Sequence, residues 1–288
     1  MRGWNQFCRR ATMRRWQADP SAAALLSIGY GGIATPDIAN QLANPDRLRP
    51  FMRRKRPKSF NPSASEHARL RRRWRRWLPV LESDISHLLG KKEIFWDLQK
   101  VAKENGEVLS AFFEWMCSNY IIATAIEIRA LVDRRSDVHS LWRMLYEILE
   151  HPGVINRRAH AALYRDSPPA REFNMADLTF DEVAGKRSLA LRQRDIRADL
   201  RELEDVSERV HTFVNKRLAH RAPKGELRRL PRFNEVDRAM ATIDRIFCKY
   251  SLLLTAKGMS TTFATRQDNW MAVLHEPWIK PGSKFRPV

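Results

Sequence analysis

The spacing of apolar residues between positions 65 and 253 is the feature that most restricts how this chain can fold. Apolar side chains recur there at steps of three and four residues, the period of an amphipathic α-helix, and no strand-rich stretch is recognisable in the sequence. The pattern therefore predicts an all-α protein. The expected helices cover residues 65–90, 93–103, 110–132, 136–151, 196–220 and 236–253.

Residues that stop or cap helices mark several of the expected ends. Gly90 should end the first helix, and Asn105-Gly106 should end the second because both residue types accept left-handed backbone angles. Ser136-Asp137 should cap the fourth helix, which His151-Pro152-Gly153 stops. The short link between the third and fourth helices predicts an antiparallel hairpin.

The same periodicity predicts which helix faces are buried. In residues 93–103 it directs Ile94, Leu98 and Val101 inward. Residues 110–132 are the most apolar stretch of the chain, which predicts a central and largely buried helix. The last two expected helices carry long apolar seams and should belong to one helical bundle.

Composition divides the chain into three parts. Residues 1–62 contain repeated prolines and no sustained period, so we expect a basic and mostly irregular arm. Residues 63–258 form the predicted helical bundle, in which residues 165–190 are expected to be a surface excursion without a clear period. Residues 259–288 are expected to be an extended tail that packs on the bundle through two tryptophans.

The excess of positive charge is concentrated near the N-terminus. The formal charge is +19, and residues 1–77 hold 18 lysines and arginines against 4 acids, a net of +14. One hypothesis is therefore an arm that binds nucleic acid through its charge. An equal interpretation is a start placed too far upstream, because Met52 could open a shorter chain.

Two tryptophans lie inside a run of arginines just after the arm. Trp74 and Trp77 are surrounded by arginines at positions 71, 72, 73, 75 and 76. The indoles could stack on bases and clamp a nucleic acid. Equally, they could anchor the core while the arginines face water.

The chain lacks the signals of several common protein classes. Cys8, Cys117 and Cys248 lie far apart, so neither a disulfide framework nor a cysteine zinc site is expected. Hydrophobic runs are too short to cross a bilayer and no export signal is recognisable, which favours a cytoplasmic protein. The sequence has no phosphate-binding loop, dinucleotide fingerprint or nucleophile elbow. We therefore expect no cofactor and no bound metal.

The segment Asn215-Lys216-Arg217-Leu218-Ala219-His220 ends the fifth expected helix and is the strongest functional signal. Lys216 and His220 stand four residues apart, so they should share a helix face, with Asn215 and Arg217 beside them. A histidine can move a proton near neutral pH while a fixed cation stabilises charge on phosphorus, which suits RNA cleavage without a metal. Basic residues in a last helical turn also stabilise the helix dipole wherever they occur, and this alternative stays open.

This motif, with the loop and helix after it, resembles the signature helix of the HEPN superfamily, in particular its AbiU-like branch. The run Ile128-Arg129-Ala130-Leu131-Val132-Asp133, followed by Ser140-Leu141, resembles the first helical pair of that branch, and the likeness covers residues 93–257. The resemblance implies an antiparallel helical bundle that forms a homodimer. In active members it implies a metal-independent endoribonuclease of a toxin-antitoxin or antiphage system, with an antitoxin-like protein as partner.

What the resemblance implies for this chain is a site that binds RNA or a nucleotide. The candidate catalytic residues are His220, Lys216, Asn215 and Arg217. The candidate substrate-binding residues are Arg129, Asp133 and Arg209. Arg129 and Asp133 share a helix face, and an internal ion pair is the alternative interpretation of these two.

The sequence departs from the pattern of active members at one position. Those members carry an arginine where this chain has Phe213, Val214 or Asn215, and the nearest upstream arginine is Arg209. The departure favours a second hypothesis, in which the bundle is a non-catalytic interaction or structural module and the basic cluster caps a helix.

Overall fold

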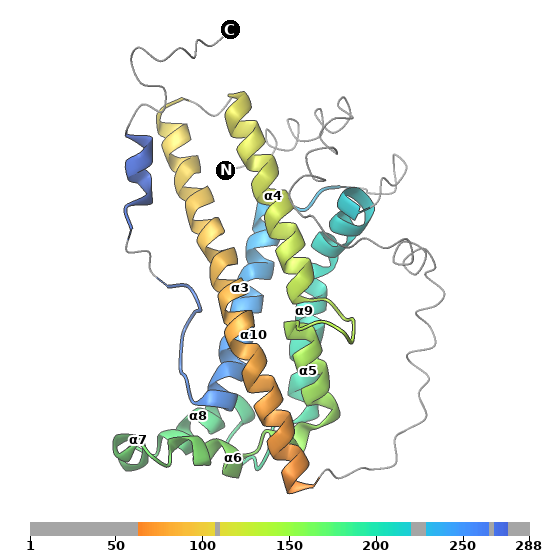
Figure 1. Cartoon of the computed structure of the whole chain (residues 1–288), viewed down its shortest axis with the longest axis vertical. Helices are drawn as coiled ribbons and strands as arrows, with labels where there is room; N and C mark the ends of the chain where they lie inside the picture. Colours follow the sequence, from red (N-terminus) through yellow and green to blue (C-terminus); the bar gives the residue numbers. More distant parts are fainter. Residues whose placement is uncertain (1–62, 107–109, 220–228, 265–267, 276–288) are drawn as a thin grey trace.

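The computed structural model describes four stretches of the chain, residues 63–106, 110–219, 229–264 and 268–275. The expected arm at residues 1–62 lies outside them. Every regular element in the described stretches is a helix (Figure 1), and the β-bridge between Asn156 and Ala190 is isolated. The prediction of an all-α protein is confirmed. In these stretches no helix combines the length and the apolar character that crossing a bilayer requires.

The described helices follow one another in a simple order. They are α3 (Ala64–Glu104), α4 (Ala111–Leu131), α5 (Leu141–Glu150), η5 (Pro152–Val154), α6 (Arg157–Ala161), η6 (Ala162–Tyr164), α7 (Pro168–Glu172), α8 (Met175–Ala184), α9 (Gln193–Phe213), η7 (Val214–Ala219), α10 (Phe233–Thr255) and η8 (Trp270–Leu274).

The helix α3 is the longest element, and it starts at a serine cap. Ser63 Oγ accepts a hydrogen bond from Glu66 N at 3.3 Å. The helix then runs through Pro79 and Gly90, so the expectation that Gly90 ends a helix is wrong. An internal glycine costs a helix about 1 kcal/mol and an internal proline about 3 kcal/mol. Side chains buried on both sides of these two residues offset that cost, because they fix the helix against its neighbours.

The helices α4 and α5 lie end to end along α3 (Figure 1). Near one end of α3, Phe95 stacks on Tyr120 of α4 with ring centroids 3.8 Å apart. Near the other end, Trp74 Nε1 donates a hydrogen bond to Glu147 Oε2 of α5 at 2.9 Å. Both helices therefore run antiparallel to α3, and the hairpin expected between them is wrong. The unbroken α3 offers one continuous surface to both.

The helices α9 and α10 complete the bundle as an antiparallel pair. Near the start of α9, Asp199 Oδ2 accepts hydrogen bonds from Lys249 Nζ at 2.7 Å and from Tyr250 Oη at 2.8 Å. Near its end, Arg209 Nε lies 3.2 Å from Glu235 Oε1. The seams predicted in these two helices are buried together, so the bundle alternates in direction from α3 through α4 and α5 to α9 and α10.

The buried face in the last turns of α3 differs from the predicted one. Ile94, Leu98 and Val101 are each only half-buried, and the residue after each of them is buried. The prediction treated these turns as a separate helix. Because α3 is continuous, the register of its core face is set by the preceding turns, and it moves the buried positions by one residue.

The helix α4 is buried on one face only. Phe112, Trp115 and Ile126 keep 56%, 52% and 45% of their surface exposed. The buried residues of α4 lie on the face that contacts α3, α9 and α10. The prediction of a largely buried helix is therefore wrong for its opposite face, which is apolar and exposed.

The short helices α6, α7 and α8 gather at one end of the bundle (Figure 1). The expectation of a surface excursion without a clear period at residues 165–190 is wrong for α8, whose Phe180 is fully buried, while α7 has no buried residue. A proline pair at the start of α7 suits its first turn, where no backbone donor is needed.

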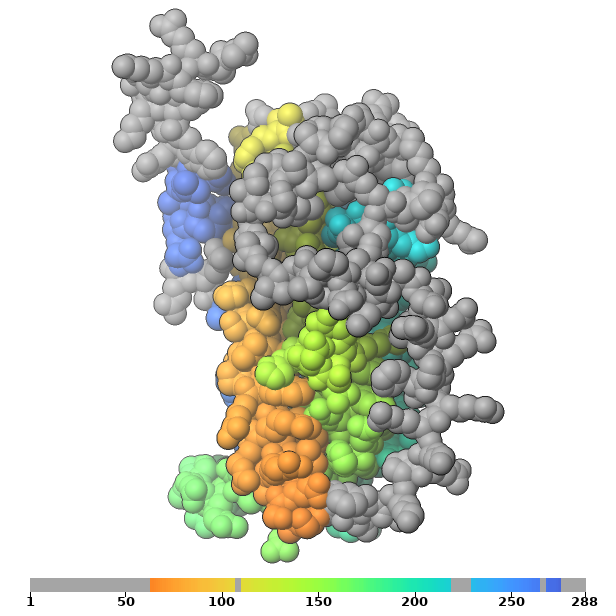
Figure 2. Space-filling view, turned by 45° about the vertical axis from the view of Figure 1, so that its right-hand side comes forward, coloured from red at the N-terminus to blue at the C-terminus, as the bar shows by residue number. Residues whose placement is uncertain are grey.

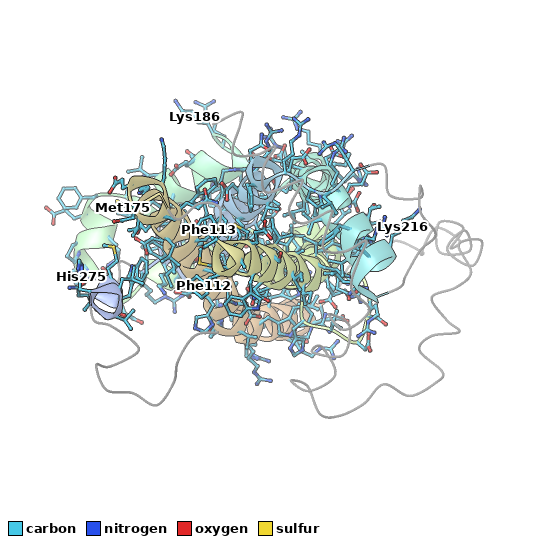
Figure 3. All side chains as sticks on the ribbon, turned by 90° about the horizontal axis from the view of Figure 1, so that it is seen from above. Phe112, Phe113, Met175, Lys186, Lys216 and His275 are labelled. Atoms are coloured by element: carbon cyan, nitrogen blue, oxygen red, sulfur yellow. The ribbon has the colours of Figure 1, made fainter. Side chains whose placement is uncertain are left out.

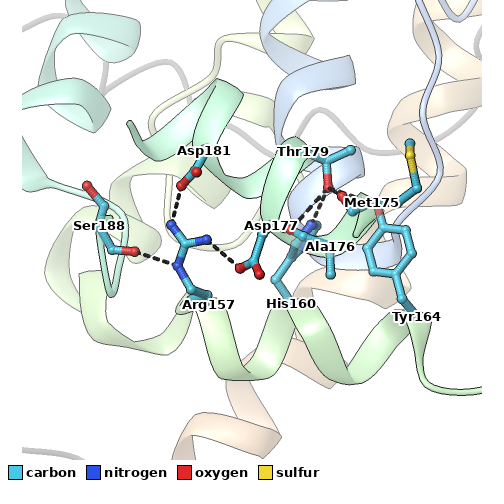
Figure 4. A network of polar contacts seen from close by, with 9 residues as sticks. All are labelled: Arg157, His160, Tyr164, Met175, Ala176, Asp177, Thr179, Asp181 and Ser188. Atoms are coloured by element: carbon cyan, nitrogen blue, oxygen red, sulfur yellow. Dashed lines mark hydrogen bonds and ion pairs between the residues drawn. The ribbon is translucent and has the colours of Figure 1, made fainter. Parts of the chain in front are cut away.

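A polar network fastens this end to the bundle (Figure 4). The buried His160 of α6 bonds Leu253 O of α10 through Nδ1 at 3.1 Å, and Thr179 Oγ1 of α8 through Nε2 at 2.9 Å. Arg157 bonds two aspartates of α8, with Asp177 Oδ1 at 2.5 Å. Burial lowers the pKa of His160, which keeps the imidazole neutral between its two partners.

The segment after α10 is held by a buried carboxylate. Thr262 N and Thr262 Oγ1 both donate to Asp244 Oδ1, each at 2.8 Å. Of the two tryptophans expected to pin the tail, Trp270 is half-buried in η8 and Trp278 lies outside the described stretches.

The cap of α5 is Ser140, so the expectation of a cap at Ser136-Asp137 is wrong. Ser140 Oγ accepts from Arg143 N at 3.0 Å and donates to Asp133 O at 2.5 Å, which ties the start of α5 to the chain that leaves α4. The side chain is fully buried.

We predict that Ser140→Ala lowers the free energy of unfolding by about 1 to 2 kcal/mol, because it removes the cap and leaves the part-buried carbonyl of Asp133 without its donor. The matched control is Ser63→Ala, which removes an exposed cap of α3 and should cost about 0.5 kcal/mol. Urea unfolding at constant pH measures both. Equal losses in the two variants would contradict the tie between α4 and α5.

Candidate functional site

The predicted motif lies on a segment that is not an α-helix. Val214–Ala219 form the π-helical segment η7, which continues directly from α9. Hydrogen bonds in a π-helix span five residues, so side chains four apart no longer stand above one another. The shared face expected for Lys216 and His220 stays a prediction, because His220 lies beyond the part of the chain that the structure describes. Such segments occur often at functional sites.

A chain of hydrogen bonds joins η7 to α4. Arg129 Nε of α4 donates to Asn215 Oδ1 at 3.0 Å. Asn215 Nδ2 in turn lies 3.2 Å from Nδ1 of His211, one turn earlier on α9. We call Arg129, Asp133, His211 and Asn215 the α4–α9 polar cluster.

Arg129 determines which group donates and which accepts in this series of hydrogen bonds. A guanidinium only donates, so the atom of Asn215 that faces it must be the amide oxygen. The amide nitrogen then faces His211 and donates to Nδ1. A neutral imidazole whose Nδ1 accepts carries its proton on Nε2, so His211 presents a donor on its other edge.

Asp133 holds Arg129 from the other side. Its Oδ2 lies 3.5 Å from Arg129 Nη1, which makes the ion pair that the shared helix face indicated. Its Oδ1 accepts from Arg135 N at 2.9 Å, which fixes the carboxylate at the end of α4. The guanidinium of Arg129 is thus oriented by one carboxylate and one amide.

Electrostatics favour a neutral His211. Partial burial of the imidazole lowers its pKa first, and the nearby cations Arg129 and Arg134 lower it further, against the smaller opposite effect of Asp133. Arg134 is itself held by Glu204, at 3.2 Å, and lies 5.4 Å from the centre of the Trp142 ring. The cluster at neutral pH therefore combines fixed guanidinium charge with an uncharged imidazole donor.

The other predicted site residues lie at different distances from this cluster. Lys216 and Arg217 are half-buried on η7, and Lys216 lies toward the outer edge of the molecule on that segment (Figure 3). Arg209 is engaged with Glu235, which also binds Arg229, on the side of α9 that faces α10. His220 lies outside the described residues. The geometry thus brings Arg129, Asp133 and Asn215 together and places Arg209 in a separate ion pair.

Sequence reasoning missed His211. The signal was present, since His211 stands four residues before Asn215 and an α-helix places such a pair in contact. It was overlooked because the motif directs attention to residues after position 214.

No outside relationship assigns this site. Comparisons of the chain with known protein families, curated proteins and solved structures give no match. Within the stretches that the structure describes, no three His, Cys, Asp or Glu side chains form a group that could hold a metal ion. The chemistry of the site is therefore argued from its own contacts.

We predict that Arg129→Gln raises the pKa of His211. The substitution removes one of the cations that disfavour the imidazolium and leaves Asp133, which favours it. Titration of the His211 ring by NMR measures the change.

The control is Arg245→Gln, which removes an exposed arginine that pairs with Glu202 at 2.5 Å on the α9–α10 side. It should leave the titration of His211 as in the parent chain. An identical pKa of His211 in the parent and in Arg129→Gln would show that the guanidinium does not act on the imidazole.

Proposed function

We propose that this chain is a HEPN-like protein that binds RNA, and that the α4–α9 polar cluster with η7 forms its phosphate-binding site. The observation that carries the proposal is the directed hydrogen-bond chain from Arg129 through Asn215 to His211, located at the motif that resembles the HEPN signature. The antiparallel arrangement of the long helices supports the same family.

The chemistry of the cluster suits a phosphodiester. Arg129 supplies a planar guanidinium whose orientation is fixed by two partners, and guanidinium groups bind phosphate oxygens through parallel N–H donors. The neutral His211 adds an N–H donor at Nε2 without adding charge. Phosphate contacts of this kind position an RNA strand and carry no base preference by themselves.

Cleavage is a separate part of the proposal. Nδ1 of His211 is occupied by the Asn215 amide, so His211 is placed to donate rather than to remove a proton. The general acid-base role in a metal-independent endoribonuclease therefore falls to His220, with Lys216 or Arg217 stabilising charge on phosphorus. In this proposal the protein acts as a homodimer in a toxin-antitoxin or antiphage system, restrained by an antitoxin-like partner.

We predict that Asn215→Ala weakens RNA binding about tenfold, which corresponds to about 1.4 kcal/mol. The variant releases both Arg129 and His211 from their fixed positions. His211→Ala, which keeps the bond from Arg129 to Asn215, should give a smaller loss. Fluorescence anisotropy with a labelled single-stranded RNA measures both.

The control for this comparison is again Arg245→Gln, which changes one exposed charge away from the cluster. Circular dichroism of each variant verifies that the helices are intact. If Asn215→Ala and Arg245→Gln bind RNA equally well, the cluster is not a phosphate-binding site.

We predict that the purified chain cleaves RNA in the presence of a chelator, and that His220→Ala abolishes cleavage while it leaves RNA affinity within about twofold of the parent. Gel analysis of labelled RNA measures the products. Cleavage that persists unchanged in His220→Ala would come from another protein in the preparation and would remove the enzymatic part of the proposal.

A second candidate function is a non-catalytic interaction module. The apolar exposed face of α4, formed by Phe112, Trp115 and Ile126, favours it because such residues often mark protein contacts. The absence of an arginine at positions 213 to 215 favours it as well. Intact RNA after incubation with the parent chain would support this candidate over the nuclease.

A further inference from the structure

The tryptophans and arginines near the start of α3 point in opposite directions. Trp74 is fully buried and Trp77 is 9% exposed, so they belong to the core and cannot stack on bases. The arginines of the same turns lie on the remaining surface of the helix, which Figure 2 shows on the outside of the molecule (orange). We call them the α3 arginine stripe, namely Arg69, Arg71, Arg72, Arg73, Arg75 and Arg76.

Two members of the stripe are anchored by neutral groups. Arg71 Nη1 donates to Val154 O at 3.0 Å, and Arg75 Nε donates to Leu254 O at 2.6 Å. A carbonyl oxygen orients a guanidinium but does not cancel its charge. Burial lowers the pKa of Arg71, and repulsion from Arg75 and Arg72 lowers it further.

The carboxylates around the stripe are few. Between residues 64 and 78 the sequence has Glu66 as its one acid, and Arg69 Nη2 lies 3.7 Å from its Oε1. Arg73 pairs with the buried Glu147, which is shared with Arg143 at 3.3 Å. Two carboxylates thus face the six guanidinium groups of the stripe and that of Arg143. The surface therefore keeps a strong positive charge.

This arrangement lowers the stability of the isolated helix. Within the stripe several pairs of arginines stand three or four residues apart, and like charges at these spacings cost about 0.2 to 0.5 kcal/mol each. Arg71, Arg73 and Arg75 bond neighbouring elements and help to hold α3 in place. The packing of α3 does not need Arg69, Arg72 and Arg76, since its core contacts come from the other face. A polyanionic partner would convert the repulsion into attraction.

We propose that the α3 arginine stripe is a second RNA-binding surface that follows the phosphate backbone of a strand. Residues 69 to 76 span about 10 Å at the rise of an α-helix, so their charges follow at about one per 2 Å. That density exceeds the roughly one phosphate charge per 3.4 Å along one strand, so the stripe offers more than one guanidinium for each phosphate that it would follow. The choice of RNA rests on the function proposed above.

The burial of the tryptophans favours RNA over a lipid surface as the partner of the stripe. A helix that lies on a membrane inserts its apolar face into the headgroup region. The apolar face of α3, with Leu70, Trp74, Trp77 and Leu81, is already buried in the bundle. The exposed surface of α3 can therefore bind a partner only through its positive charge, as a protein does when it contacts a phosphate backbone.

The test replaces three exposed members of the stripe in the full chain, as Arg69→Gln, Arg72→Gln and Arg76→Gln together. The control is Arg194→Gln, Arg197→Gln and Arg201→Gln on α9. Those residues are also exposed, have the same spacing and change the net charge equally. Both variants keep residues 1–62, so any contribution of that region to binding is common to them.

Affinity for a labelled mixed-sequence single-stranded RNA is measured across a salt series. The stripe variant should bind at least tenfold more weakly at low salt, and its slope of log affinity against log salt should fall by about 2, since each lost phosphate contact removes about 0.7. The control should keep the slope of the parent. A lysine version of the stripe variant, which keeps the charge, should recover most of the affinity.

Three outcomes overturn or redirect the proposal. Equal affinity and slope in the stripe and α9 variants overturn it. Loss of binding to phosphatidylserine vesicles with unchanged RNA binding overturns it in favour of a membrane contact. Failure of the lysine version to recover binding overturns it as well, because the loss then comes from the fold and not from charge.

The test distinguishes this proposal from the function that it extends. If the stripe variant loses RNA affinity while Asn215→Ala does not, the stripe stands and the α4–α9 polar cluster fails as a phosphate site. If Asn215→Ala alone loses affinity, the cluster stands and the stripe fails.

Discussion

The unbroken course of α3 is the constraint on which the rest of the structure depends. One helix passes through a proline and a glycine, packs on α4 and α10, and bonds α5 through Trp74. The deepest contact on it is Trp74, whose indole donates to Glu147 while Arg73 and Arg143 neutralise that carboxylate. Removing one partner would leave a buried charge uncompensated, which costs a protein several kcal/mol. This contact holds the last turns of α5 against α3, while α5 packs along α9.

Most of the fold could be predicted from the sequence because helical periodicity is a local property. The all-α class, the boundaries of α4 and α10 within a few residues, the start of α9, and the seams of the last two helices all follow from spacing. The errors arose where distant contacts outweigh local preference. Gly90 continues a helix because both of its flanks are packed, and α5 lies in line with α4 because α3 is long enough to hold both.

The candidate site was predictable in its location more than in its geometry. The motif directed attention to Asn215, and the shared face of Arg129 and Asp133 indicated their ion pair. The π-helical turn could not be read from the sequence, since it depends on how η7 packs against α4. His211, on the regular helix before that turn, is the imidazole that Asn215 contacts.

The amide of Asn215 has a consequence for the charge of this surface. The amide oxygen accepts from Arg129 and the amide nitrogen donates to His211, so every hydrogen bond in the series runs in the same direction. A carboxylate of the same shape would accept on both sides and would draw a proton onto the imidazole. The amide therefore leaves in force the low pKa that burial and the neighbouring arginines give His211. Counting every histidine here as a positive charge would overestimate the charge of this surface.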